Sequence, residues 1–192
     1  MNKIIAIAGM TGSGKSVVAD FLVHKGFQFL RMGQICLDIV KERGLEPIEE
    51  NERPIRENLR KEHGMGAFAK LNIPKINKLL EKGNVVTDNL MSWAEYNEFE
   101  EKYKDNFICI AVYASPKTRY ARLAGRKYDP DKDPEMRHRP ASADQARIRD
   151  FKEIENIEKG GPIAMAHYTL INEGTKEDIL KQCDELFQKI LV

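Results

Sequence analysis

Short and almost uninterrupted apolar stretches alternate along the chain with longer segments in which apolar residues recur every three or four positions. The short stretches predict strands buried on both faces of a sheet, at residues 3–8, 27–32, 84–88, 107–114 and 168–171. The longer segments predict amphipathic helices, at residues 16–25, 34–43, 46–82 (in two pieces, broken near Gly64 and Gly66), and from Trp93, Pro116 and Thr175 onward. Strands that alternate with helices predict a three-layer α/β fold with about five parallel strands.

The segment from about residue 125 to residue 149 does not fit this alternation. Pro130 and Pro134 exclude regular helix and central strand, because proline fixes the backbone and lacks an amide hydrogen. Helix is predicted to resume at Ser142, since Ser142 and Gln145 have the spacing of a capping box. Residues 117–149 contain ten Lys and Arg against five Asp and Glu, whereas the whole chain has a net charge of only +1. We therefore expect a basic lid at about 125–149 that closes over a bound nucleotide.

Size and composition narrow the class of protein. The 192 residues predict one domain, spanning 1–192. A net charge close to zero argues against a chain that coats nucleic acid or anionic membrane, and no apolar run is as long as a membrane span. The cysteines are odd in number and far apart, which favours reduced thiols in a cytoplasmic protein, at Cys36, Cys109 and Cys183. We expect a monomer or homodimer without a specific nucleic-acid or membrane partner.

A phosphate-binding motif joins the first predicted strand to the first predicted helix. It reads Gly9-Met10-Thr11-Gly12-Ser13-Gly14-Lys15-Ser16, which matches G-x-x-x-x-G-K-[ST]. The glycines of such a loop let backbone amides point at phosphate oxygens, and the following helix adds the positive end of its dipole. All eight residues are predicted to bind ATP. Lys15 is expected to reach the β- and γ-phosphates as a catalytic residue, and the Ser16 hydroxyl to hold Mg²⁺.

A second magnesium anchor is expected at the end of the third predicted strand. Asp88 closes the run Val85-Val86-Thr87-Asp88, and open α/β sheets bind their ligands at the carboxyl ends of strands. A carboxylate there would hold the Mg²⁺ of MgATP beside Ser16. The alternative is an acid that only begins a turn with Asn89.

Arginines of the basic region are candidates for stabilising the transferring phosphoryl group. Arg119, Arg122 and Arg126 recur at helical spacing, and Arg137 and Arg139 lie in the insertion. Phosphoryl transfer spreads negative charge over several oxygens, so arginines that close over the site contribute strongly. We assign Arg122 and Arg126 as catalytic, although exposed helices also carry solvated arginines.

Taken in order, these motifs resemble the nucleotide-kinase branch of P-loop proteins, which includes nucleoside-monophosphate kinases and dephospho-coenzyme A kinases, and more closely a group of small P-loop kinases common in archaea. The resemblance runs nearly end to end. It rests on residues 9–16, Met32-Gly33 opening a helix, residues 58–65, the strand that ends at Asp88, residues 114–119 leading to Arg122 and Arg126, residues 166–168, and Ile171-Asn172-Glu173-Gly174-Thr175.

The resemblance implies a sheet order of 2-3-1-4-5 and a nucleotide-like acceptor held between the helices after strands two and three. It places Asn172 and Gly174 near the adenine of ATP. On the acceptor side it points to the segment at about 34–82, and to Gly33 and Asn89. The chain departs from the pattern at this acceptor site, because Leu37 and Met91 occupy positions where related kinases usually carry arginine, and residues 31–34 contain no acid.

Other arginines would have to replace those that are missing, since a buried phosphate without donors is costly. Arg56 and Arg60 are the substitutes that we assign to the acceptor, with Arg53 as a further candidate. Alternatively, these arginines pair with glutamates along a surface helix, at Glu49, Glu50, Glu57 and Glu62.

The sequence therefore predicts an ATP- and Mg²⁺-dependent kinase that transfers the γ-phosphoryl group to a small nucleotide-like acceptor. A nucleoside monophosphate and dephospho-coenzyme A remain alternative acceptors. Two other classes stay open. One is a P-loop switch or motor that hydrolyses its nucleotide, and the other is an ATP-binding regulator that has lost acceptor phosphorylation, as the missing acceptor arginine suggests.

Overall fold

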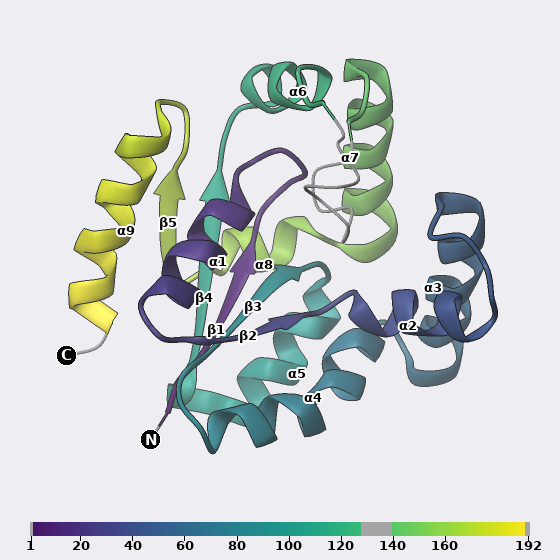
Figure 1. Ribbon diagram of the computed structural model, residues 1–192, viewed down its shortest axis with the longest axis horizontal. Coiled ribbons are helices and arrows are strands. Elements are labelled where there is room, and N and C mark those ends of the chain that lie inside the picture. Colours follow the sequence, from purple (N-terminus) through teal and green to yellow (C-terminus); the bar gives the residue numbers. More distant parts are fainter. Residues whose placement is uncertain (1, 128–139, 191–192) are drawn as a thin grey trace.

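Five parallel strands form the centre of the protein. The computed structural model describes residues 2–127 and 140–190, and Figure 1 shows their arrangement. The strands are β1 (Ile4–Ala8), β2 (Gln28–Arg31), β3 (Val85–Leu90), β4 (Phe107–Tyr113) and β5 (Tyr168–Ile171). They are hydrogen-bonded in the order β2-β3-β1-β4-β5, and every neighbouring pair is parallel. The predicted fold class and strand order are confirmed.

The central position of β1 in the sheet explains why its sequence is apolar at every position. Ile4 of β1 is in register with Val85 of β3 on one side and with Phe107 of β4 on the other. All five residues of β1 are buried, because helices cover both faces of a parallel sheet. The register of β1 and β3 shifts between Ala6 and Ala8, just before β1 leads into the phosphate-binding motif.

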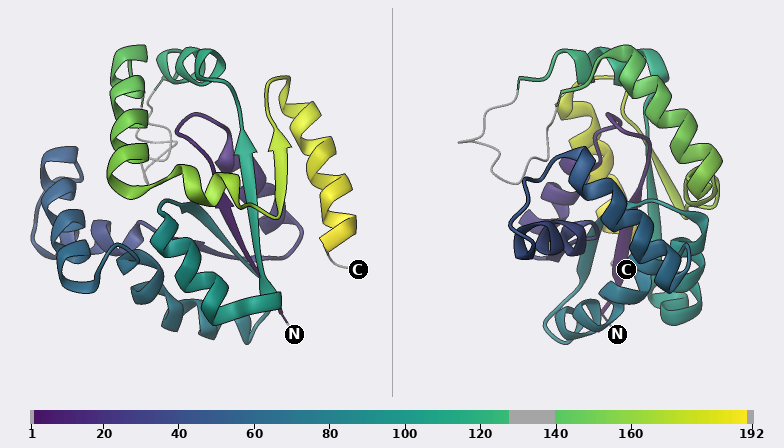
Figure 2. Two further views of the ribbon diagram at one scale, coloured as in Figure 1. Left: turned by 180° about the vertical axis from the view of Figure 1, so that it is seen from behind. Right: turned by 90° about the vertical axis from the view of Figure 1, so that its right-hand side faces the viewer.

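Helices cover both faces of the sheet, as Figures 1 and 2 show. They are α1 (Lys15–His24), α2 (Gln34–Glu42), α3 (Glu49–His63), α4 (Ala67–Leu80), α5 (Trp93–Tyr103), α6 (Pro116–Ala124), α7 (Ala143–Ile157), α8 (Gly160–Ala164) and α9 (Lys176–Ile190). Ile5 and Ile7 of β1 pack in a cluster with residues of α1 and α9. The alternate residues Ile4 and Ala6 pack in a second cluster with residues of α2 to α5. The two faces of the sheet thus follow the two-residue period of the strands.

The predicted starts of the helices that flank the lid are confirmed. Ser115 caps α6 by accepting a hydrogen bond from the Thr118 amide, with Pro116 in the first turn. Ser142 and Gln145 form the capping box that begins α7. Residues 128–139 of the expected lid, including Arg137 and Arg139, lie outside the described residues, so the lid itself stays a prediction.

Some element boundaries differ from those expected. The segment predicted as two helical pieces over 46–82 begins later, at α3, and breaks at Gly64, whose φ of 81° is left-handed. The third strand continues two residues past Asp88, to Leu90. The short helix α8 was not predicted, because five residues that contain two glycines and a proline show no periodic pattern.

Two general expectations can be compared with the described residues. Within residues 2–127 and 140–190, no helix is long and apolar enough to cross a membrane. All three cysteines lie in this part of the chain and are buried free thiols, as predicted.

Candidate active site

The phosphate-binding loop lies between the carboxyl end of β1 and the start of α1, in the middle of the sheet. Gly9, Gly12 and Gly14 have φ values of 146°, 83° and 99°, which side chains rarely allow. A Cβ at Gly14 would lie 2.1 Å from the Asn172 side-chain nitrogen, and one at Gly9 would lie 2.5 Å from the Val112 carbonyl oxygen. The backbone therefore takes a shape that only glycine permits at these positions.

Lys15 is held inside this loop. Its Nζ donates hydrogen bonds to the carbonyl oxygens of Gly9 at 2.9 Å and of Met10 at 3.2 Å. Burial lowers the pKa of Lys15 well below its usual value, and the charge of nearby Lys159 lowers it further. Phosphate oxygens are the groups that would compensate a buried ammonium at the N-terminus of a helix.

Asn172 connects the phosphate-binding loop to the carboxyl end of β5 through a hydrogen bond. It is buried, directly follows β5, and donates from Nδ2 to the Ser13 carbonyl oxygen at 2.8 Å. The structure thus brings Asn172 against the phosphate-binding loop, from which it is separated by more than 150 positions in the sequence.

The two residues predicted to hold magnesium lie at the same edge of the sheet. Ser16 is in the first turn of α1, and Asp88 is near the end of β3, the strand next to β1. The carboxylate of Asp88 also accepts a hydrogen bond from the Met32 amide at 3.3 Å. Among residues 2–127 and 140–190, no cluster of three or more His, Cys, Asp or Glu could hold a metal ion. A hydroxyl and a single carboxylate fit Mg²⁺, which is commonly held by one or two protein oxygens together with phosphates and water.

Arg122 reaches the loop that follows β5. Its guanidinium donates to the carbonyl oxygen of Asn172 at 2.8 Å and to that of Gly174 at 3.3 Å. Arg122, which is predicted to be catalytic, therefore contacts Asn172 and Gly174, which are predicted to lie near the adenine. Arg126 is half-buried just beyond the end of α6. Their catalytic role stays a prediction.

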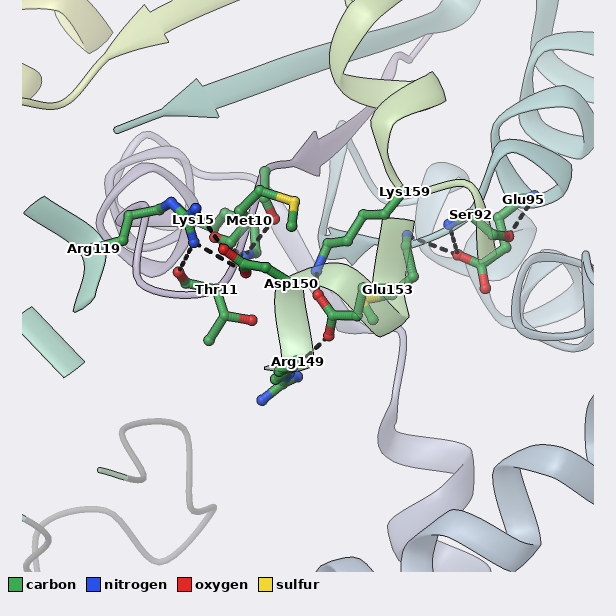
Figure 3. Close-up of polar contacts among 12 residues, drawn as sticks. Met10, Thr11, Lys15, Ser92, Glu95, Arg119, Arg149, Asp150, Glu153 and Lys159 are labelled. Carbon is green, nitrogen blue, oxygen red and sulfur yellow. Dashed lines mark hydrogen bonds and ion pairs between the residues drawn. The ribbon is translucent and has the colours of Figure 1, made fainter. Parts of the chain in front are cut away.

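A buried ion pair, not predicted from the sequence, joins the loop to α6 and α7 (Figure 3). Arg119 of α6 makes two hydrogen bonds to Asp150 of α7, at 3.1 and 2.6 Å, with both side chains almost fully buried. The same guanidinium donates to the Thr11 carbonyl oxygen at 3.0 Å. Helices α6 and α7 are thereby attached to the phosphate-binding loop.

A second buried pair lies farther along α7 (Figure 3). Glu153 accepts a hydrogen bond from Lys159 at 2.6 Å and one from Arg149 at 2.7 Å, and Lys159 is inaccessible to solvent. Burial opposes ionisation of Glu153, but the attraction of Lys159 and Arg149 prevails and lowers its pKa to about 2. Charged residues on a helix in sequence give no sign of this burial, because solvated helices show the same spacing.

Residues on the acceptor side show two different arrangements. Gly33 is at the N-terminus of α2, where a Cβ would meet nothing within 4 Å. Asn89 has a φ of 60°, a left-handed conformation that asparagine tolerates better than most residues. It lies inside β3, directly after Asp88, where the register between β3 and β1 shifts. Whether either residue contacts an acceptor stays a prediction.

The candidate arginines of α3 also differ from one another. Arg53 pairs with Glu57 at 2.7 Å, and Arg56 pairs with Glu49 at 2.6 Å and Glu52 at 3.2 Å. These pairs are of the kind that the alternative reading of α3 as a surface helix predicts. A role of Arg56 in acceptor binding stays a prediction. In the structure its guanidinium is paired with the carboxylates of Glu49 and Glu52.

Arg60 lies deeper than its neighbours on α3. Its guanidinium carbon is 5.3 Å from the centre of the Phe68 ring. Its Nε is buried and has no hydrogen-bond partner among the described residues. Burial lowers the pKa of Arg60, and the nearby carboxylate of Glu95 raises it in part.

Glu95 is a buried acid at the start of α5 that the sequence analysis did not single out. Its Oε2 accepts hydrogen bonds from the amides of Met91 at 2.8 Å and Ser92 at 3.3 Å, while its Oε1 is buried without a partner in the described chain. Burial raises its pKa to about 6. The Ser-x-x-Glu spacing from Ser92 signals the helix start, but it does not reveal the vacant oxygen.

Comparison with known proteins gives relatives along nearly the whole chain. A family model described as an AAA domain matches residues 5–166. A UPF0200 protein of Thermococcus gammatolerans is 35% identical over 190 residues, covering 98% of this chain and 95% of the relative. A UPF0200 protein of Sulfurisphaera tokodaii is 37% identical over 193 residues, covering 98% of each.

Solved structures with a similar fold include kinases. A shikimate kinase from Bacteroides thetaiotaomicron has a TM-score of 0.58 and 15% identity, covering 97% of this chain and 98% of that one. A gluconokinase from Sinorhizobium meliloti has a TM-score of 0.55 and 12% identity, covering 97% of each chain. At this identity the likeness establishes the P-loop kinase fold and no substrate.

Proposed function

This chain belongs to the UPF0200 family and carries an AAA domain of the P-loop class, and we propose that it is a kinase that transfers the γ-phosphoryl group of MgATP to a small nucleotide-like acceptor. The acceptor is of the nucleoside-monophosphate or the dephospho-coenzyme A class. The observation that carries the proposal is the phosphate-binding loop, in which glycine geometry and a partly buried lysine occur together with an acid on the neighbouring strand.

The residues of the loop suit the recognition of a triphosphate. Lys15 is partly buried and bonded only to backbone carbonyl oxygens in the described chain, so phosphate oxygens can replace those carbonyls without breaking an ion pair. Successive amides around Gly14 and Lys15 would hold further oxygens at the start of α1. Ser16 and Asp88 would hold Mg²⁺ through oxygen.

The reaction needs positioning rather than a covalent enzyme intermediate. An oxygen of the acceptor forms a bond to the γ-phosphorus, the bond from that phosphorus to the β–γ bridging oxygen breaks, and ADP leaves. The proton of the acceptor oxygen goes to water. Lys15 stabilises the charge on the phosphate oxygens, while Arg122 lies on α6 and Arg126 just beyond its end, beside the predicted lid.

The similar folds support a small-molecule acceptor. Shikimate kinase and gluconokinase are named for small-molecule substrates, and this chain has the same fold over almost its full length. Transfer of their function by fold alone is an analogy, so the specific acceptor has to come from the site.

An alternative proposal is an ATP-binding protein or ATPase that does not phosphorylate an acceptor. It is favoured by Leu37, which occupies the position of an acceptor arginine in related kinases, and by the ion pairs that already engage Arg56. Such a protein would bind MgATP, or hydrolyse it, without transfer to any compound.

The test is phosphoryl transfer from radiolabelled ATP to a panel of nucleosides, nucleoside monophosphates and dephospho-coenzyme A. The wild type should label at least one acceptor, and Lys15→Met should reduce that transfer at least about a hundredfold, because the charge at the β- and γ-phosphates is lost. Lys181→Met, at an exposed position of α9, is the matched control and should transfer normally. MgATP should also raise the thermal stability of the wild type. Transfer by Lys15→Met at the wild-type rate would contradict the proposal, and ATP binding without transfer would favour the alternative.

A further inference from the structure

A carboxylate oxygen of Glu95 is fixed in position without a partner. The amides of Met91 and Ser92 hold Oε2, as part of the capping box that begins α5. This anchoring determines where the second oxygen lies. Glu95 is 1% exposed, and its Oε1 is buried with no hydrogen-bond donor in the described chain. A buried acceptor without a donor is costly, and more so when it is charged, so a donor from outside the described residues is expected to satisfy it.

The side chain of Arg60 has a buried donor without an acceptor, the counterpart of the buried acceptor of Glu95. Its Nε–H is a donor, is buried, and has no acceptor in the described chain. Arg60 and Glu95 are each the charged neighbour that acts most strongly on the other. Arg60 lies against Phe68 of α4, and Ser92, whose amide binds Glu95, donates from its hydroxyl to the Met65 carbonyl oxygen just before α4. Lys159, next to α8, also acts on Glu95 and on Lys15 of the phosphate-binding loop. Glu95 begins the helix that follows β3 and binds the amide of Met91, so its vacant oxygen lies near the carboxyl end of the strand that carries Asp88.

The hydrogen-bonding capacities of Glu95 Oε1 and Arg60 Nε determine which chemical group can bind to both atoms. A hydroxyl can donate to Oε1 and accept from Nε–H at once, because it carries one hydrogen and two lone pairs. A phosphate offers only acceptors and would place negative charge beside the Glu95 carboxylate, whereas an ammonium would place positive charge beside Arg60.

We propose that Glu95 and Arg60 bind a hydroxyl group of the acceptor, so that the acceptor is recognised through an alcohol and not through a phosphate at this position. The identification of the bound molecule as the phosphoryl acceptor rests on the proposed function, but binding of a hydroxyl group at this site can be tested without any phosphoryl transfer. Glu95 and Arg60 are then specificity-determining residues, in a part of the site where Leu37 and Met91 replace the expected arginines.

The experiment is thermal stabilisation of the full chain with a non-hydrolysable ATP analogue and Mg²⁺, at pH 8, by hydroxyl-bearing probes. The probes are adenosine, dephospho-coenzyme A, shikimate and gluconate, and inorganic phosphate serves for comparison. The variants are Glu95→Gln, which keeps an oxygen for the capping box, and Arg60→Met, which removes the guanidinium but keeps a long unbranched side chain. Glu98→Gln is the control, one turn farther along α5, where the native side chain pairs with Lys70 at 3.2 Å.

A hydroxyl probe that stabilises the wild type and Glu98→Gln, and binds at least about tenfold more weakly to Glu95→Gln and Arg60→Met, supports the proposal. If no hydroxyl probe stabilises the wild type more than Glu95→Gln and Arg60→Met, the vacant atoms hold only structural water and the proposal fails. Arg60 is only partly buried, so Arg60→Met keeps the test decisive if Glu95→Gln does not fold. Failure of the proposed function would instead appear as absent phosphoryl transfer, which this binding experiment does not measure.

A pH profile separates hydroxyl recognition from a purely structural role of Glu95. Burial raises the pKa of Glu95 to about 6, and the facing cations, Arg60 and Lys159, lower it in part. Binding of a hydroxyl donor to the ionised carboxylate should therefore weaken as the pH falls below about 6. The dependence should disappear in Glu95→Gln. A binding profile that is the same in the wild type and in Glu95→Gln would contradict the proposal.

Discussion

The ammonium group of Lys159 lies 2.6 Å from the carboxylate of Glu153, and Lys159 is completely shielded from solvent. The pair joins the residue that precedes α8 to α7, close to Lys15 of the phosphate-binding loop (Figure 3). Buried charges are tolerated only when they are paired and hydrogen-bonded. Glu153 meets this condition by accepting from both Lys159 and Arg149.

Removal of the Glu153 charge is expected to destabilise the fold. Glu153→Gln leaves Lys159 buried without a counter-charge, and breaking a buried pair in this way typically costs about 3–5 kcal/mol. Urea unfolding at pH 7 would measure the loss in the free energy of unfolding. Glu155→Gln, at an exposed position of the same helix, is the matched control and should change stability by less than about 0.5 kcal/mol. Equal stability of the two variants would show that the pair contributes nothing.

The same pair predicts how stability depends on pH. The attraction of Lys159 and Arg149 lowers the pKa of Glu153 in the folded protein to about 2, against 4.5 as its ordinary value. A depressed pKa in the folded state gives stability that is complete above pH 4.5 and is lost as the pH falls toward 2. The difference in melting temperature between the wild type and Glu153→Gln should therefore shrink below pH 4.5. A difference that stays constant between pH 3 and 7 would exclude this assignment.

Gly14 is expected to be indispensable for nucleotide binding. Gly14→Ala would place a Cβ 2.1 Å from the Asn172 side chain in a backbone with a φ of 99°, so either Asn172 or the loop must move. We expect ATP affinity to fall at least about tenfold, since the amides of the loop lose their alignment. Gly83→Ala is the control, because a Cβ there meets nothing within 4 Å and its φ is not left-handed. Calorimetric titration with MgATP compares the two, and normal affinity of Gly14→Ala would disprove the predicted clash.

Binding of MgATP is expected to take up a proton at alkaline pH. Burial and the charge of Lys159 lower the pKa of Lys15 well below 10.5 in the free protein, and phosphate oxygens beside the ammonium would raise it again. Between the lowered pKa and 10.5, a fraction of Lys15 is neutral before binding and protonated afterwards. Titrations in buffers of different ionisation enthalpy measure the uptake.

The matched variant for this experiment is Lys15→Arg, which keeps the positive charge but does not titrate in this range. It should bind MgATP without the proton uptake. Equal uptake by the wild type and Lys15→Arg would assign the proton to another group.

Much of the fold follows from patterns that are local in the sequence. The unbroken apolar run at Ile4–Ala8 can be satisfied only by burial on both faces, so a parallel sheet with helices on either side was predictable. The caps at Ser115 and Ser142 were also predictable from local sequence, because a helix cap depends on residues within one turn. The glycines and Lys15 of the phosphate-binding loop form one contiguous segment, and their geometry accords with the motif.

The candidate site beyond that loop depends on contacts between distant segments. Nothing near Lys159 in the sequence indicates that it loses all contact with water, and nothing near Glu95 indicates that Arg60 faces it from another helix. Burial and electrostatic partners are properties of the packed chain, because they depend on which helices the topology brings together. The sequence by itself determined the strands, the caps and the phosphate-binding loop, whose causes lie within a few residues. Only the tertiary structure decided which charged side chains are buried, which of them are paired, and which polar atoms remain vacant for a ligand.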